Sequence, residues 1–203
     1  NGADVNAEDK DGWTVLMVAA DGGYEDTVKL LIEHGAVVNA KNEDGQTALM
    51  LVSSGGHTDS IKILIEHGAN VDAQDEDGRT PLMFAVDGGY EDTVKLLIDN
   101  GADIDVQDKD GRTALMRAVD NGHIDTVKLL IDNGADVNVK DNYGQTALDY
   151  AKAKGYKEIA EMIEEYQSKQ PKFNKEKTDE LIELMNSIVD IDDLPEEKFN
   201  EIV

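Results

Sequence analysis

The sequence predicts an all-α repeat solenoid with short β-hairpin fingers, and three observations predict it. A pattern of turn residues returns every 33 positions, as the step from Thr14 to Thr47 illustrates. Aromatic residues make up 5% and hydrophobic residues 40% of the 203 residues, a shortage that favours many shallow cores over one deep core. Glycines also fall where each expected helix must end.

The repeat is carried by a turn glycine that is followed two positions later by threonine. Residues 21–32 recur unchanged at residues 87–98, and no insertion disturbs the step. A fixed period of this length identifies stacked units, each of which buries its apolar stripe only against its neighbours. The turn glycines of the five copies are Gly12, Gly45, Gly78, Gly111 and Gly144.

Each unit begins with a short helix. The threonine is expected at the N-cap, and Pro81 follows Thr80 at a position where a helix tolerates proline. Leu16, Ala19 and Ala20 share one face of this helix, and the small alanines allow close packing of neighbouring units. A glycine pair, residues 22–23 in the first unit, then ends the helix.

A second helix and a hairpin complete the unit. The second helix is expected from about residue 25 to residue 34, with Val28, Leu31 and Ile32 inward and Gly35 as its left-handed end. Residues 37–47 alternate in polarity around an Asp-Gly pair, which indicates a hairpin turn.

The two ends of the chain differ from the repeats. Residues 1–10 are interpreted as the tail of a preceding unit, and residues 11–167 as four full repeats and a final partial one. Residues 168–203 are expected to form a C-terminal helical cap or the start of a following region, with an amphipathic helix after Thr178 and a short helix from Pro195. A docking or dimerisation helix is the alternative for this segment.

These units resemble ankyrin repeats. The resemblance rests on TPLMFA at residues 80–85 and NGADVN at residues 133–138, and it covers about residues 1–167. It implies a curved, ankyrin-like stack of helix–turn–helix–hairpin units whose first helices and hairpins line a concave, protein-binding groove. One departure recurs, because methionine stands where the family usually has a histidine that links units, and we expect slightly looser specificity between units. The residues concerned are Met17, Met50, Met83 and Met116, and then Asp149.

Comparison of the units with one another separates framework positions from variable ones. Variable positions follow the turn glycine, lie two residues after each buried leucine, or lie near the end of the first helix. They carry tryptophan, phenylalanine, tyrosine and arginine, which are the residue types of interface hot spots. Adding Tyr143, the candidate groove residues are Trp13, Val18, Asp21, Gln46, Leu51, Arg79, Phe84, Asp87, Arg112, Arg117, Asp120, Tyr143, Gln145 and Tyr150.

The charge of the chain restricts its partners. Nineteen basic against 44 acidic residues give a net charge of −25, which disfavours nucleic acid and anionic membrane surfaces. We expect a protein partner of mixed or basic charge with an apolar anchor. We also expect no membrane insertion, and a monomer with dimerisation through the C-terminal helix as the alternative.

No enzymatic activity, cofactor or metal is expected. Cysteine is absent, and the Asp-rich loops at Asp75 and Asp108 resemble calcium loops but lack two of the required ligands. The histidines at His34, His57, His67 and His123 are interpreted as helix-end residues.

The leading hypothesis is therefore a protein–protein interaction module. The alternatives are a targeting region of a larger enzyme or secreted bacterial effector, and an engineered or consensus-like repeat protein. We expect a cytoplasmic location, or delivery into a host cytoplasm for an effector. Because residue 1 is asparagine, a removed leader stays open.

Overall fold

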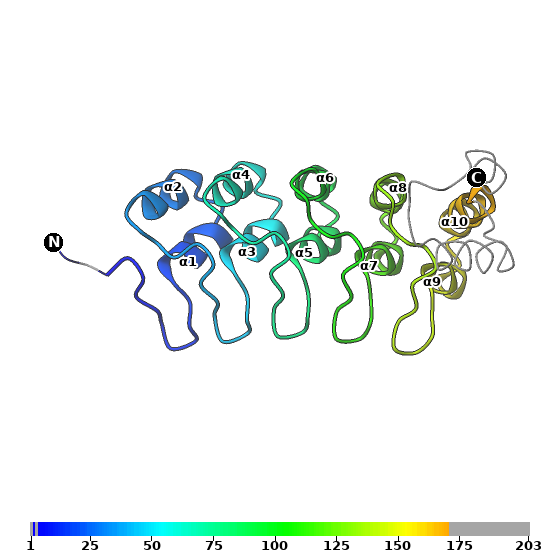
Figure 1. Ribbon diagram of the computed structural model, residues 1–203, viewed down its shortest axis with the longest axis horizontal. Helices are drawn as coiled ribbons and strands as arrows, with labels where there is room; N and C mark the ends of the chain where they lie inside the picture. The colour runs from blue at the N-terminus through cyan, green and yellow to red at the C-terminus, as the bar shows by residue number, and fades with distance from the viewer. Residues whose placement is uncertain (1, 3, 171–203) are drawn as a thin grey trace, which may run out of the picture. The chain divides into compact units, whose positions relative to one another are not determined.

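The computed structural model describes residue 2 and residues 4–170. Ten α-helices follow one another in these residues (Figure 1). The helices predicted after residue 177 lie outside the described residues. The helix bounds are α1 Val15–Asp21, α2 Glu25–Glu33, α3 Ala48–Ser54, α4 Thr58–Glu66, α5 Pro81–Asp87, α6 Glu91–Asp99, α7 Ala114–Asn121, α8 Ile124–Asp132, α9 Ala147–Lys154 and α10 Lys157–Lys169.

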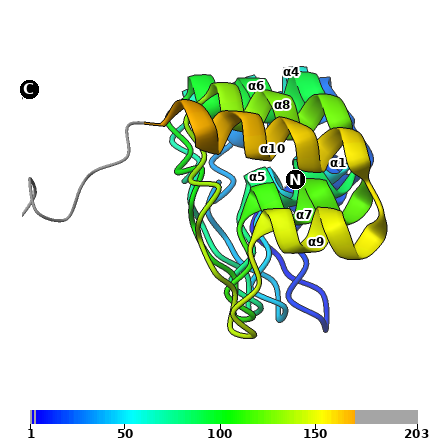
Figure 2. The same cartoon turned by 90° about the vertical axis from the view of Figure 1, so that its right-hand side faces the viewer.

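The helices up to residue 166 are arranged in two layers. The first helices of the units, α1, α3, α5, α7 and α9, pack side by side in one layer, and α2, α4, α6 and α8 pack in the other. The loops that precede the first helices all project to the same side of the stack (Figure 2). These loops are called fingers below. The predicted all-helical repeat stack is confirmed.

Threonine caps begin the first helices, as the sequence predicts. The Thr14 hydroxyl oxygen accepts a hydrogen bond from the backbone N–H of Met17 at 3.2 Å, and equivalent bonds form at Thr80, Thr113 and Thr146. These bonds satisfy one of the N–H groups that a helix start leaves unpaired. Thr47 is an exception, because its hydroxyl oxygen is buried without a partner.

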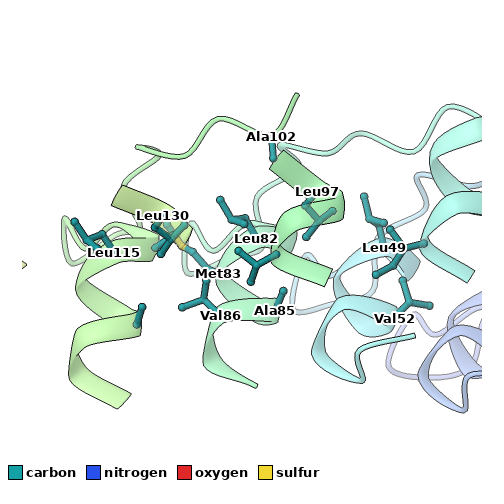
Figure 3. Packing of buried hydrophobic residues seen from close by; sticks show 14 of the residues in the cluster. Leu49, Val52, Leu82, Met83, Ala85, Val86, Leu97, Ala102, Leu115 and Leu130 are labelled. Atoms are coloured by element: carbon teal, nitrogen blue, oxygen red, sulfur yellow. The ribbon is translucent and has the colours of Figure 1, made fainter. Parts of the chain in front are cut away.

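The core is a continuous band between the two layers. Leu82 and Met83 of α5 lie between side chains of the neighbouring units, with Leu97 and Leu130 of the second-helix layer close by (Figure 3). The four methionines that replace the usual histidine are all fully buried. They fill the band with adaptable apolar volume, which is how such side chains act in cores.

The fingers contain hairpin turns but almost no strand. Between residues 4 and 170 the fingers show one isolated β-bridge, Glu8 to Thr14. Each finger turn is closed by two backbone hydrogen bonds, such as those from Asp75 N to Arg79 O and from Gly78 N to Asp75 O, both at 3.0 Å. The Asp75 side chain accepts two further backbone N–H groups, from Asp77 at 2.9 Å and Arg79 at 2.8 Å. Because the Asp75 carboxylate accepts these N–H groups, they do not form the strand-to-strand hydrogen bonds of a longer hairpin.

Neighbouring fingers are bonded to each other along the stack. At their tips, the backbone N–H of Glu76 donates to Asp44 O at 2.8 Å, and the same bond recurs between the other neighbouring fingers. Gly45 makes this approach possible, because its φ is +75° and a Cβ atom there would lie 2.8 Å from Glu76 N. At their bases, the Asn39 side chain accepts from Asn70 N and donates to Gly68 O, both at 2.8 Å.

An aromatic ring at the start of each second helix packs against glycines at the ends of the first helices. The Tyr90 ring lies over Gly88 of its own unit and Gly56 of the preceding unit, so closely that a Cβ atom on either glycine would overlap it. Gly56 also has a φ of +70°. The glycine pairs therefore end the first helices and also leave room for the next ring. The equivalent rings belong to Tyr24, His57, His123 and Tyr156.

Candidate functional site

The fourteen candidate residues lie on the first helices and the fingers. We call them the candidate surface. Because the first helices stand side by side, equivalent positions of successive units fall in rows across the stack (Figure 1). The side chains in these rows differ in how much surface they offer. Val18 is 55% exposed, whereas Leu51 at the equivalent position is only 6% exposed and packs in the core.

Arg117 is held in a network that spans two units. Its guanidinium group bonds Asp87 at 2.9 Å and Asp108 at 2.6 Å, with side-chain exposures of 17% for Arg117 and 3% for Asp108. Asn121 Nδ2 also donates to Asp87 at 3.3 Å. Burial acts to lower the pKa of Arg117, but the two carboxylates outweigh it and the pKa is raised. Arg117 therefore links α5, α7 and the finger that contains Asp108.

Arg79 is bound within its own unit. Its Nε and NH2 atoms bond Asp75 Oδ2 at 2.9 and 2.8 Å, and NH2 also lies 3.4 Å from Asp77. The guanidinium carbon lies 4.8 Å from the centre of the Phe84 ring, at cation–π distance. Two carboxylates and one ring therefore already occupy this arginine.

Tyr150 and Asp141 form a third polar cluster. The Tyr150 hydroxyl donates to Asp141 Oδ2 at 2.7 Å, while Asp141 Oδ1 accepts the backbone N–H groups of Tyr143 and Gln145. Burial together with the bond to Asp141 raises the pKa of Tyr150 to about 12. Burial opposes ionisation of Asp141, but the bond from Tyr150 and the backbone N–H groups outweigh it and lower the pKa of Asp141.

Arg112 differs from the other two arginines. Its guanidinium carbon lies 5.7 Å from the centre of the Tyr150 ring. Within residues 4–170 it forms no ion pair, and its buried Nε atom, like that of Arg117, has no hydrogen-bond partner.

The remaining candidate residues are partly engaged. Asp120 binds Lys154 Nζ at 2.7 Å, and Gln46 Oε1 accepts from Asn42 at 3.2 Å. Trp13 is half-buried, and Tyr143 is 73% exposed at the tip of the last finger. Arg117 and Asp87 bind each other, and Arg79 and Asp120 bind charged residues outside the candidate set. The candidates that still offer exposed or unpaired groups are Trp13, Val18, Asp21, Arg112, Tyr143 and Gln145.

The aspartates that begin the last three finger turns are a part of the surface that sequence reasoning did not identify. Asp75, Asp108 and Asp141 are nearly buried and organise the arginines and Tyr150. The sequence does carry a signal for two of these contacts. Asp108 and Arg117 are nine positions apart, and Asp141 and Tyr150 have the same spacing.

The described part of the chain gives little support for metal binding or membrane insertion. No group of three or more His, Cys, Asp or Glu side chains is placed to hold a metal ion between residues 4 and 170. The calcium-like loops use their acids on their own backbone and on arginine. The four histidines lie at helix ends, as predicted, with His34 Nδ1 2.8 Å from Leu30 O. No helix among the described residues is long and apolar enough to cross a membrane.

Comparison with known proteins agrees with the repeat. A family model described as ankyrin repeats (3 copies) matches residues 1–75, 35–108 and 100–175. No curated protein matches the chain.

Proposed function

Since the chain belongs to the ankyrin-repeat family, whose repeats generally serve as protein–protein interaction modules, we propose that it binds a protein surface or peptide in a concave groove lined by the first helices and the fingers. The candidate surface is this groove. The proposed role is binding without catalysis, by a chain that acts as a monomer.

One observation carries this proposal. The exposed apolar side chain of Val18 and the partly exposed ring of Trp13 lie on the first unit, on the same side of the stack as the unpaired Arg112 guanidinium. Exposed aromatic and arginine side chains on one side of a protein are residue types that binding hot spots favour. The partner that fits has an apolar anchor and mixed or basic charge.

The charge of the stack supports the same partner class. Residues 168–203 hold 5 basic and 10 acidic groups, so residues 1–167 carry −25 − (−5) = −20. Exposed acids such as Asp44, Asp77 and Asp110 repeat at the finger tips. A negative rim of this kind speeds the approach of basic groups, and the effect falls as salt is added.

The test uses short peptides selected against this protein from a randomised displayed library. Val18 on α1 and Leu30 on α2 offer a matched pair, because they belong to the same unit and are 55% and 54% exposed. Covering half of a valine contributes about 1 kcal/mol, which corresponds to roughly fivefold in affinity. We expect Val18→Ser to weaken the selected peptides about fivefold, and Leu30→Ser to leave them within twofold.

Trp13 provides the readout, because it is the sole tryptophan in the sequence. Its fluorescence reports a peptide that covers the first unit. The opposite pattern, with binding lost in Leu30→Ser and kept in Val18→Ser, would place the site on the second-helix layer and overturn the proposal.

A further inference from the structure

Arg79 and Arg112 occupy the same position in successive units. Each follows a turn glycine, and each has an aspartate four positions earlier, Asp75 or Asp108. Arg79 binds its aspartate through two nitrogen atoms, at 2.9 and 2.8 Å. Without another influence, Arg112 would bind Asp108 in the same way.

A single difference between the units prevents this. Where the earlier unit has Phe84, the later unit has Arg117, and its NH2 atom lies 2.6 Å from Asp108 Oδ2. The other oxygen, Asp108 Oδ1, accepts the backbone N–H groups of Asp110 and Arg112 at 2.9 and 2.8 Å. Both oxygens of Asp108 are therefore used, and the Arg112 side chain is displaced from it.

The next unit does not supply a substitute. Asp141 lies near enough to Arg112 for their charges to interact, but its Oδ2 accepts from the Tyr150 hydroxyl and its Oδ1 accepts two backbone N–H groups. The Arg112 guanidinium instead lies over the Tyr150 ring, which restricts its orientation. Within residues 4–170 Arg112 is therefore the arginine that has no bound carboxylate, whereas Arg79 and Arg117 each contact two aspartates.

We propose that Arg112 is the carboxylate-binding group of the candidate surface, and that it takes the side chain of an Asp or Glu residue of the partner. The inference rests on the proposed function and deepens it. A guanidinium group matches a carboxylate in two-pronged geometry, and the Tyr150 ring holds it ready for such a bond. In a chain of charge −25, one arginine without a carboxylate gives an acidic partner residue a place to bind, while basic partner residues face the finger tips.

The first test needs no partner. The sequence contains three arginines, Arg79, Arg112 and Arg117, so their Nε–H signals are readily resolved by NMR after isotope labelling. Acetate serves as the probe, with chloride at equal ionic strength as the control. We expect acetate to shift the Arg112 signal in a saturable way and to leave those of Arg79 and Arg117 in place. An Arg112 signal that responds equally to both salts would overturn the assignment.

The second test uses the selected peptides with amidated C-termini, so that only side chains carry a carboxylate. We expect an Asp or Glu at a fixed position, and replacement of it by Asn or Gln should weaken binding roughly 10- to 100-fold. Arg112→Gln should cause the same loss, and the two changes together should be no worse than one. Lys95→Gln on α6 is the control, since it removes one positive charge outside the candidate surface.

The outcomes separate the two proposals. Independent, additive losses from the peptide and Arg112 changes would contradict the carboxylate contact even if Val18→Ser weakens binding as proposed. A saturable acetate shift with no effect of Val18→Ser would keep the anion site and reject the proposed function.

Discussion

The competition between Arg112 and Arg117 for Asp108 predicts a partial rescue. In Arg117→Phe, the later unit acquires the aromatic residue of the earlier one, and Asp108 becomes free to pair with Arg112. Removal of Arg117 breaks its charged hydrogen bonds to Asp87 and Asp108. Such bonds contribute about 1.5–3 kcal/mol each, and the half-exposed contact with Asp87 less than that.

The loss in free energy of unfolding depends on whether Arg112 replaces Arg117 in the bond to Asp108. If Arg112 replaces the bond to Asp108, only the Asp87 contact is lost, and Arg117→Phe should lower the free energy of unfolding by about 1–2 kcal/mol. In the double variant Arg112→Gln with Arg117→Phe, the carboxylate of Asp108, 3% exposed, has no cation nearby. Breaking a buried pair in this way costs about 3–5 kcal/mol.

Urea unfolding followed by circular dichroism measures both variants, with Arg112→Gln alone as the control. We expect the double variant to lose at least about 2 kcal/mol more than Arg117→Phe. Equal destabilisation of the two would refute the competition between the arginines. The acetate response of the Arg112 signal should also disappear in Arg117→Phe.

Two further predictions concern the stack. Gly56→Ala should lower the free energy of unfolding by about 2 kcal/mol in the same urea assay, because the new Cβ combines a left-handed φ of +70° with overlap of the Tyr90 ring. Gly68→Ala is the control, and it should cost only about 1 kcal/mol, because Gly68 has a φ of +84° but open space around it. Tyr150 should ionise near pH 12 in spectrophotometric titration. Since its pKa is raised from 10.0 to about 12, its contribution to stability is complete below pH 10 and is lost as pH rises toward 12. Loss of this contribution below pH 10 would contradict the bond to Asp141.

Local rules were sufficient to predict the helical stack. The spacing of Thr14, the glycine pair at residues 22–23 and Gly35 each act within a few residues, so their consequences for helix ends can be read from the sequence. The fingers were predicted with less precision. Strand pairing did not extend, because the backbone donors of each finger bind its own aspartate, or Asn42 in the second finger, and the neighbouring finger.

Contacts between units were beyond this reasoning. The ring of Tyr90 on Gly56 and the bond from Arg117 to Asp87 join residues about one unit apart, so they appear only once the stack is built. For the same reason, variable positions were all expected to face a partner. The structure shows that Arg117 and Arg79 are paired with aspartates of the stack and that Leu51 is buried in the core. Variability between units identified a candidate surface on the finger side but could not separate binding from mutual pairing.

Hydrogen–deuterium exchange with and without a selected peptide tests the central claim most directly. The proposed groove predicts slower exchange in α1, α3, α5, α7 and the fingers before them, with unchanged exchange in α2, α4, α6 and α8. Protection confined to the second helices would contradict the claim that the partner binds on the finger side.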